Sequence, residues 1–224
     1  MSENRLEAVL WDLDGVIADT GEYHYQAWQE VFGKRGYAFS KEDFMRHFGR
    51  RHDTIIRFAI GENISTEEFN IITREKQENY RRRVVSNIRP LPGAIELIRS
   101  LNEHSIKTAI ASSAPMENIE IIIQGLKIEG CFQAIASGTE VAEGKPSPQI
   151  FLLAAEKLEA TPSNCVVIED AIAGVSAAKQ AGMKCIAVTN SHPGKSLKKA
   201  DLIVTTLESV SIDDLTGLFG LATG

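Results

Sequence analysis

The chain has 224 residues, of which 43% are hydrophobic and 24% charged, and its formal net charge is −6. This composition is typical of a globular protein, and the apolar runs are too short to span a membrane. The acidic net charge argues against nucleic acid as the main partner. The three cysteines form no Cys-x-x-Cys pair, and the amino terminus lacks a secretory signal pattern. We therefore expect a cytoplasmic protein with reduced thiols.

An apolar run over residues 6–13 predicts a buried strand that ends in two carboxylates, Asp12 and Asp14. Gly15 permits a sharp turn directly after them. A strand buried on both faces belongs in a parallel sheet, whose carboxyl edge is the usual place for chemistry. Two carboxylates there can hold a hard cation or divide the roles of nucleophile and acid/base. The alternative interpretation is an acidic surface turn.

Residues 21–89 show helical periodicity without strong strand signals. The predicted helices cover residues 22–36, 40–48, 52–60 and 65–85. Ser40 with Asp43, and Ser65 with Glu68, indicate helix starts of the capping-box kind. This segment has a slight excess of basic residues, whereas the rest of the chain is acidic. The difference suggests a basic lid that attracts a small anion, above an acidic core that holds a cation. Charged residues on solvated helix faces would explain it equally well.

Beyond Pro90 the predicted elements alternate between helices and strands. The strands cover residues 107–112, 134–137, 165–169, 184–188 and 202–204, and the helices cover 94–103, 116–126, 148–158 and 173–180. Repeated β–α units predict a parallel sheet with right-handed crossovers. We therefore expect an α/β fold, with a doubly wound, Rossmann-like core from residues 1–18 and 90–224. Residues 19–89 are expected to form an inserted α-helical cap domain.

Later strand ends add the other groups that phosphoryl chemistry needs. Ser112 and Ser113 precede a helix start, where hydroxyls and free N–H groups can bind phosphate, although a serine there can also be only a cap. Lys145 lies between Gly144 and Pro146, on a loop that can aim it inward or leave it exposed.

A second apolar strand ends in adjacent acids, Glu169 and Asp170. Carboxyl ends of parallel strands meet at one edge, so these groups should converge with the first pair. An Mg²⁺ ion held by Asp12, Asp14, Glu169 and Asp170 would neutralise a phosphoryl group. Asp12 would attack phosphorus. Asp14 would protonate the leaving oxygen and later take a proton from the acceptor.

The chain resembles the haloacid dehalogenase superfamily in four motifs, taken in order along the sequence. These are residues 12–17 (Asp-Leu-Asp-Gly-Val-Ile), Ser112, Lys145-Pro146 and Glu169-Asp170. In that family the second aspartate, here Asp14, separates phosphotransferases from dehalogenases. The inserted cap is similar to that of β-phosphoglucomutases and small-molecule phosphatases. The resemblance implies that Thr20 lies at the cap hinge and that His24 couples closure to acid/base action; a helix-surface position is the plain alternative for His24.

Two departures from the mutase pattern bear on the reaction. Where those mutases carry a lysine for the substrate's second phosphate, this chain has Ser113-Ala114-Pro115. The cap loop that should contact substrate contains Arg50, Arg51 and His52, at a slightly different spacing. Both departures favour water over a sugar hydroxyl as the acceptor.

We therefore predict a monomeric, Mg²⁺-dependent phosphatase of a small phosphorylated metabolite, with a sugar phosphate as the first candidate. The first alternative is a β-phosphoglucomutase. A second is a non-catalytic phospho-acceptor of the response-regulator kind, but in those proteins the aspartate follows a middle strand and no helical insert is present.

Overall fold

The structure, a computed structural model, describes residues 5–220. Within that range six parallel strands form one sheet in the order β3-β2-β1-β4-β5-β6. The strands are β1 (Ala8–Trp11), β2 (Lys107–Ser112), β3 (Ala134–Ser137), β4 (Cys165–Glu169), β5 (Lys184–Val188) and β6 (Leu202–Val204). The predicted α/β fold with a doubly wound parallel sheet is confirmed.

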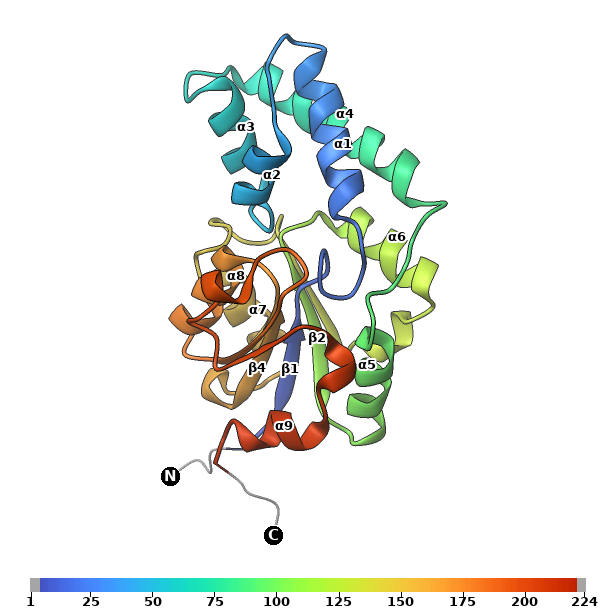
Figure 1. Cartoon of the computed structure of the whole chain (residues 1–224), viewed down its shortest axis with the longest axis vertical. Helices are drawn as coiled ribbons and strands as arrows, with labels where there is room; N and C mark the ends of the chain where they lie inside the picture. Colours follow the sequence, from blue (N-terminus) through green and yellow to red (C-terminus); the bar gives the residue numbers. More distant parts are fainter. Residues whose placement is uncertain (1–4, 221–224) are drawn as a thin grey trace.

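Helices cover both faces of this sheet (Figure 1). One face packs against α5 (Ala94–Glu103), α6 (Met116–Leu126) and α9 (Ile212–Gly217), and the other against α7 (Gln149–Lys157) and α8 (Ile172–Gln180). Each face of the sheet has its own apolar core. Alternate residues of β1 belong to different cores, because successive side chains of a strand point to opposite faces. Val9 and Trp11 belong to the first core, and Ala8 and Leu10 to the second. Both faces of β1 are therefore buried, as its apolar sequence requires.

Four further helices form the inserted cap above the carboxyl edge of the sheet (Figure 1). They are α1 (Gly21–Gly33), α2 (Lys41–His47), α3 (His52–Ile60) and α4 (Thr66–Val84). The cap has a separate apolar core that includes Trp28, Phe32, Phe44, Ile56 and Ile72. The predicted domain boundaries at residues 18/19 and 89/90 stay a prediction.

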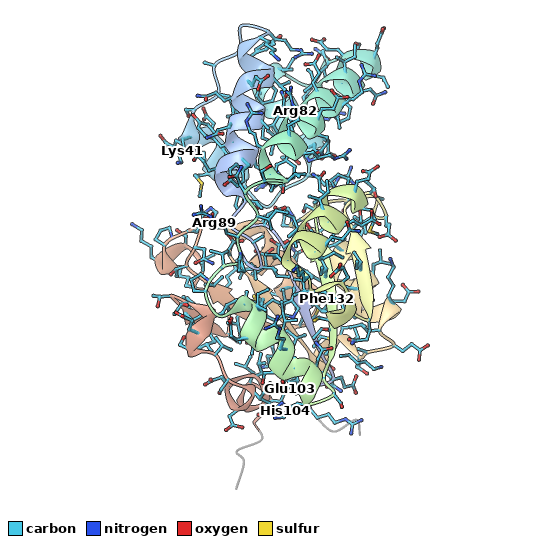
Figure 2. All side chains as sticks on the ribbon, turned by 90° about the vertical axis from the view of Figure 1, so that its right-hand side faces the viewer. Lys41, Arg82, Arg89, Glu103, His104 and Phe132 are labelled. Carbon is cyan, nitrogen blue, oxygen red and sulfur yellow. The ribbon has the colours of Figure 1, made fainter. Side chains whose placement is uncertain are left out.

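Two chain segments connect the cap to the sheet, and they run side by side. The Asp19 N–H donates to the Arg89 carbonyl at 3.0 Å, and Ala18 pairs with Pro90 in an isolated bridge. Figure 2 shows Arg89 between the cap, where Lys41 and Arg82 lie, and the sheet layer. Both crossings therefore lie at one hinge, directly beside the end of β1.

Some predicted bounds differ from the structure. The first strand ends at Trp11 rather than at residue 13, because the chain turns at Gly15, whose φ is +87°. Helix α1 ends at Gly33 rather than at residue 36, since Gly36 has a φ of +77°. Helix α9 was not predicted.

The two predicted capping boxes differ in completeness. Ser40 and Asp43 exchange both bonds of the box, whereas the Ser65 hydroxyl only accepts from the Glu68 N–H. Across residues 5–220, no helix combines the length and apolar character that crossing a membrane requires.

Candidate active site

The register of the central strands brings the predicted site residues to one edge of the sheet. Trp11 pairs with Ile110 on one side and with Ile168 on the other. The three strands therefore end at nearly the same level. This places Asp12 beside the residues that end β2 and β4.

Lys145 joins this group from the loop between β3 and α7. Its Nζ donates to Asp12 Oδ1 at 2.6 Å and to Glu169 Oε1 at 2.8 Å. All three side chains are almost fully buried. Burial alone would lower the pKa of Lys145, but the charges of Asp12 and Glu169 outweigh it and raise that pKa. Lys145 is therefore a permanent cation against Asp12.

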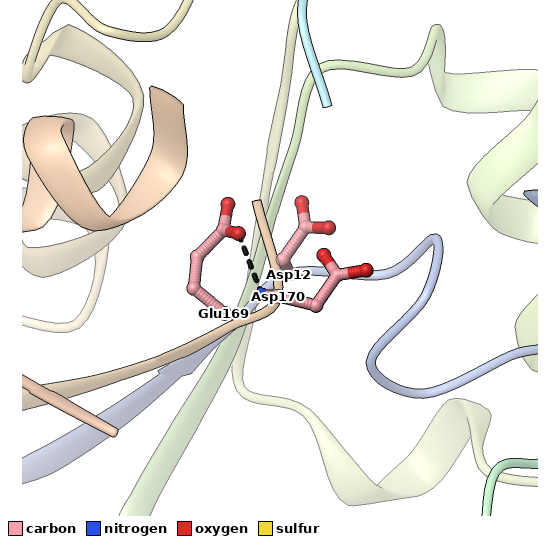
Figure 3. A group of neighbouring side chains, drawn as sticks. All are labelled: Asp12, Glu169 and Asp170. Carbon is pink, nitrogen blue, oxygen red and sulfur yellow. Dashed lines mark hydrogen bonds between the residues drawn. The ribbon is translucent and has the colours of Figure 1, made fainter. Parts of the chain in front are cut away.

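Asp12, Glu169 and Asp170 form a group that could hold a cation. A carboxylate oxygen from each lies within 4.8 Å of the others. Figure 3 shows the three side chains and the bond from the Asp170 N–H to Glu169. Burial raises the pKa of Asp12 to about 7 and that of Asp170 well above its ordinary value. Such crowding of buried carboxylates is unfavourable without a further positive charge.

Two details of this group distinguish its members. Asp170 Oδ1 is buried and has no hydrogen-bond partner in the described part of the chain, so it is free to bind a cation. Glu169 is already engaged: Oε1 accepts from Lys145, and Oε2 accepts from the N–H groups of Asp170 and Ala171. The sequence places Glu169 among the carboxylates that hold the ion, directly or through water; direct coordination would compete with these bonds.

Asp14 lies apart from that group and faces the cap. Its Oδ1 accepts from the Thr20 hydroxyl at 2.5 Å and lies 3.0 Å from His24 Nε2. Burial alone would raise the pKa of Asp14, yet His24 and the Thr20 hydroxyl lower it below the ordinary value. Thr20, expected at the cap hinge, and His24, expected to couple closure to acid/base action, thus both contact Asp14. The side chain of Asp14 lies outside the group of three possible metal ligands.

His24 is held by a residue that the sequence did not reveal, Lys76 of α4. Lys76 Nζ lies 2.8 Å from His24 Nδ1, and the His24 ring stacks on Tyr80 with centroids 3.9 Å apart. Burial and the nearby charge of Lys76 lower the pKa of His24, so the ring is neutral. Asp14 can only accept, so His24 Nε2 carries the proton and Nδ1 accepts from Lys76. Asp14, His24 and Lys76 form one chain of hydrogen bonds from core to cap.

The two serines after β2 have different roles in this structure. Ser112 is buried beside the carboxylates, and its hydroxyl accepts from the Ala114 N–H at 3.1 Å. The Ser113 hydroxyl donates to the carbonyl of Gly49 in the cap loop at 2.8 Å. Ser113 is thus a contact between core and cap. Its predicted phosphate binding would require this bond to open.

The three predicted residues of the cap loop also separate. Arg50 lines the cavity beside the carboxylates, and its guanidinium has no ion-pair partner among residues 5–220. Arg51 Nη1 donates to the carbonyls of Val141 and Ala142, in the core loop that leads to Lys145. Burial lowers the pKa of His52 well below its ordinary value, so His52 adds no positive charge to the predicted basic lid.

The cap is closed over the carboxylates. The cavity between the cap and the carboxylates has a volume of about 40 Å³, room for one or two water molecules. Its lining includes Asp12, Asp14, Lys76, Ser112 and Arg50. A larger groove of about 810 Å³ lies between α5 and the segment around α9, but it contains none of these residues. A metabolite needs several hundred Å³, so it can reach Asp12 only when the cap opens.

Comparison with known proteins agrees with this geometry. The sequence model of the haloacid dehalogenase-like hydrolases matches residues 9–188, which include the four strand ends described above. The chain belongs to this family. The resemblance predicted from the sequence is confirmed, and the protein is an enzyme of the phosphatase and phosphotransferase type found among its relatives.

Two curated relatives are informative. β-Phosphoglucomutase of Bacillus subtilis is 36% identical over 93% of this chain and 93% of its own length. The phosphorylated carbohydrates phosphatase of Thermotoga maritima is 31% identical, over 88% of this chain and 93% of its own. Relatives of similar length therefore include both a mutase and a phosphatase.

A solved structure shows the same architecture. The β-phosphoglucomutase of Clostridium difficile superimposes with a TM-score of 0.88 at 30% identity, over 96% of this chain and 97% of that chain. The capped, doubly wound fold of the enzyme is thus shared with this relative.

Proposed function

We propose that this enzyme is a phosphatase of a small phosphorylated metabolite, and that it acts through an aspartyl-phosphate on Asp12. The observation that carries the proposal is the separation of two neighbouring carboxylates. Asp12 accepts a hydrogen bond from Lys145 and lies beside the carboxylates of Glu169 and Asp170. Asp14, in contrast, is held in its ionised form by His24 and Thr20. Two carboxylates in opposed environments can take the roles of nucleophile and acid/base.

In the first step an Asp12 oxygen attacks phosphorus, and the bond from phosphorus to the leaving oxygen breaks. Lys145 favours the ionised form of Asp12 and attracts the phosphoryl oxygens. Asp14 carries the proton that it took from water in the preceding turnover, and it gives this proton to the leaving oxygen. In the second step Asp14 takes a proton from water, which attacks the phosphoryl group on Asp12 and restores the carboxylate.

The residues present fit a divalent cation, which we propose to be Mg²⁺. The fit rests on the buried, unpartnered Asp170 Oδ1 and on the crowding of Asp12, Glu169 and Asp170. Asp12 and Asp170 would be its side-chain ligands, and Asp14 would contribute its main-chain carbonyl rather than its carboxylate. When bound, the ion would neutralise charge on the transferred phosphoryl group.

The closed cavity supports hydrolysis of a compact substrate. Its cap side carries apolar side chains, Trp28, Phe44, Phe48 and Ile55, beside Arg50. A phosphorylated sugar is the first candidate, since relatives include the fructose-1-phosphate phosphatase YqaB of Escherichia coli, 29% identical over 82% of this chain and 97% of its own. The proposed enzyme works in the cytoplasm as a monomer.

A β-phosphoglucomutase is the second candidate, favoured by the 36% identity to the Bacillus subtilis mutase. Phosphoryl transfer between two hydroxyls of one sugar requires a firm hold on a bisphosphate. On the core side, residues 112–115 (Ser-Ser-Ala-Pro) provide no cation for a second phosphate. This difference favours water as the acceptor.

A screen of sugar phosphates with Mg²⁺, with and without glucose 1,6-bisphosphate, separates the two reactions. The proposal predicts inorganic phosphate as the product and no dependence on the bisphosphate. Conversion of β-glucose 1-phosphate to glucose 6-phosphate, stimulated by the bisphosphate, would instead establish the mutase. Turnover of no ester at all would contradict both.

A further inference from the structure

The loop that follows β5 contacts the site from outside the four motifs. Asn190 Nδ2 donates to the Gly15 carbonyl at 2.9 Å, and the Ser191 hydroxyl donates to Asp170 Oδ2. His192 Nδ1 lies 3.2 Å from the main-chain carbonyl of Asp170. Three consecutive residues thus contact the turn after Asp14, the carboxylate of Asp170 and the main-chain carbonyl of Asp170.

The hydrogen bond from Ser191 makes the two oxygens of the Asp170 carboxylate different. Oδ2 accepts from Ser191, whereas Oδ1 is buried without a partner in the described structure. Gly15 closes the other side: a Cβ added there would lie 2.0 Å from Oδ2. Asp170 therefore fits between Gly15 and Ser191 with little freedom to rotate about its terminal bond.

We propose that Ser191 is a positioning residue for the cation site. By holding Oδ2, its hydroxyl leaves Oδ1 as the oxygen of Asp170 that is presented to a cation. A carboxylate whose rotation is already restricted loses less entropy on binding the ion, which raises the affinity. Asn190 supports the arrangement by fixing the turn at Gly15. This inference rests on the cation site of the proposed function.

Binding of Mn²⁺ to the metal-free protein, measured from the electron paramagnetic resonance signal of the free ion, tests the inference without turnover. Ser191→Ala should weaken the Mn²⁺ affinity about 10- to 100-fold, the usual effect of losing a partner of a metal ligand. Ser191→Thr keeps the hydroxyl and should restore the affinity to within about threefold. Ser196→Ala is the matched control, because this serine lies in the same loop and its hydroxyl makes no hydrogen bond in the described structure; it should bind as the parent does.

The melting temperature of each variant in EDTA reports whether the fold is intact, so that a loss of affinity can be assigned to the site. If Ser191→Ala binds Mn²⁺ within twofold of the parent, or if Ser191→Thr fails to restore a lost affinity in a folded protein, the role of Ser191 is overturned and the phosphatase proposal stands. If the parent protein binds no Mn²⁺, the cation site fails together with this inference.

Discussion

Asp12 and Asp14 are two residues apart, yet their surroundings favour opposite protonation behaviour. Burial raises the pKa of Asp12 to about 7, while His24 and Thr20 lower that of Asp14 below its ordinary value. A positive charge is therefore needed to make Asp12 a nucleophile at neutral pH, and Lys145 supplies part of it. Asp14 is ready as a base in the closed state, which suits the attack of water on a phosphorylated Asp12.

Asp14→Asn should slow turnover of acetyl phosphate about 10²- to 10⁴-fold, because proton transfer by a positioned group typically contributes that much. The KM should change by only a few-fold, since the amide keeps the shape of the carboxylate. Steady-state kinetics measure both quantities. Asp19→Asn, a change at an exposed acid of the adjacent hinge, is the control and should leave kcat unaltered. An unchanged kcat in Asp14→Asn would assign the proton to another group.

Lys76 should reduce the stability of the fold most strongly at and below neutral pH. Burial lowers its pKa from 10.5 to about 7 in the folded protein. Between these values the unfolded chain binds more protons, so the free energy of unfolding rises with pH in this window. Lys76→Met removes the titrating group, and its gain over the parent protein should therefore shrink by about 2 kcal/mol between pH 7 and pH 9.

Urea unfolding at the two pH values measures this difference. Lys198→Met, at an exposed position, serves as the control and should show no pH-dependent difference from the parent. A Lys76→Met difference that stays constant from pH 7 to pH 9 would show that Lys76 does not titrate in this window.

At the scale of elements, the cap loop between α2 and α3 has two separable tasks. Arg50 lines the cavity, whereas Arg51 crosses to the carbonyls of Val141 and Ala142 in the loop before Lys145. A Cβ added at Gly144 would come within 2.8 Å of the Arg51 side chain, so the two loops are closely packed. We therefore expect Arg50 to touch substrate and Arg51 to stabilise the closed state.

These two arginines should respond differently to two substrates. Arg50→Ala should lower kcat/KM more for the best sugar phosphate of the screen than for acetyl phosphate, which is too small to reach the cap. Arg51→Ala should lower kcat/KM for both by similar factors, because it acts through closure. Each variant is the control for the other. Equal losses on both substrates in Arg50→Ala would remove Arg50 from substrate recognition.

The elements were easier to predict from the sequence than the contacts between them. Short runs of three to six residues located β2 to β6 with their observed bounds, because turn residues or helix signals bound each run. Helix α9 was missed, although Ser211 and Asp214 form a capping box that marks its start. Its six residues are too short to show a helical period.

The same limit applies to the site. Asp12, Lys145 and Asp170 follow strands whose ends must meet in a parallel sheet, so their convergence could be predicted. Lys76 could not, because its contact with His24 spans 52 positions and depends on how α4 is rotated against α1. Ser191 is a serine in an ordinary polar loop, and only the neighbouring Asp170 gives it a role.

At the scale of the whole molecule, the closed cap must alternate with an open one. The cavity of about 40 Å³ cannot admit a phosphorylated sugar, and both connections to the cap lie at one hinge, so we expect the cap to open about this point. In the proposed mechanism, closure limits the water beside Asp12 to the one or two molecules for which the cavity has room. Only a ligand that contacts both cap and core can favour the closed state.

Small-angle X-ray scattering should detect this equilibrium. With Mg²⁺ and orthovanadate, which imitates a transferring phosphoryl group, the radius of gyration should fall below that of the ligand-free protein. Arg51→Ala, which lacks a contact across the seam, should show a larger ligand-free radius than the parent. Identical radii in all three samples would contradict a cap that opens for substrate.

The central claim is that the phosphoryl group passes through Asp12 to water, and rapid-quench labelling tests it most directly. With acetyl [³²P]phosphate and Mg²⁺, the account predicts protein-bound label that hydroxylamine releases and that maps to the peptide containing Asp12. The label should decay at the rate of phosphate release, and a folded Asp12→Asn variant should neither acquire label nor turn over. Release of phosphate at full rate with no labelled protein, or by the Asp12→Asn variant, would contradict the account.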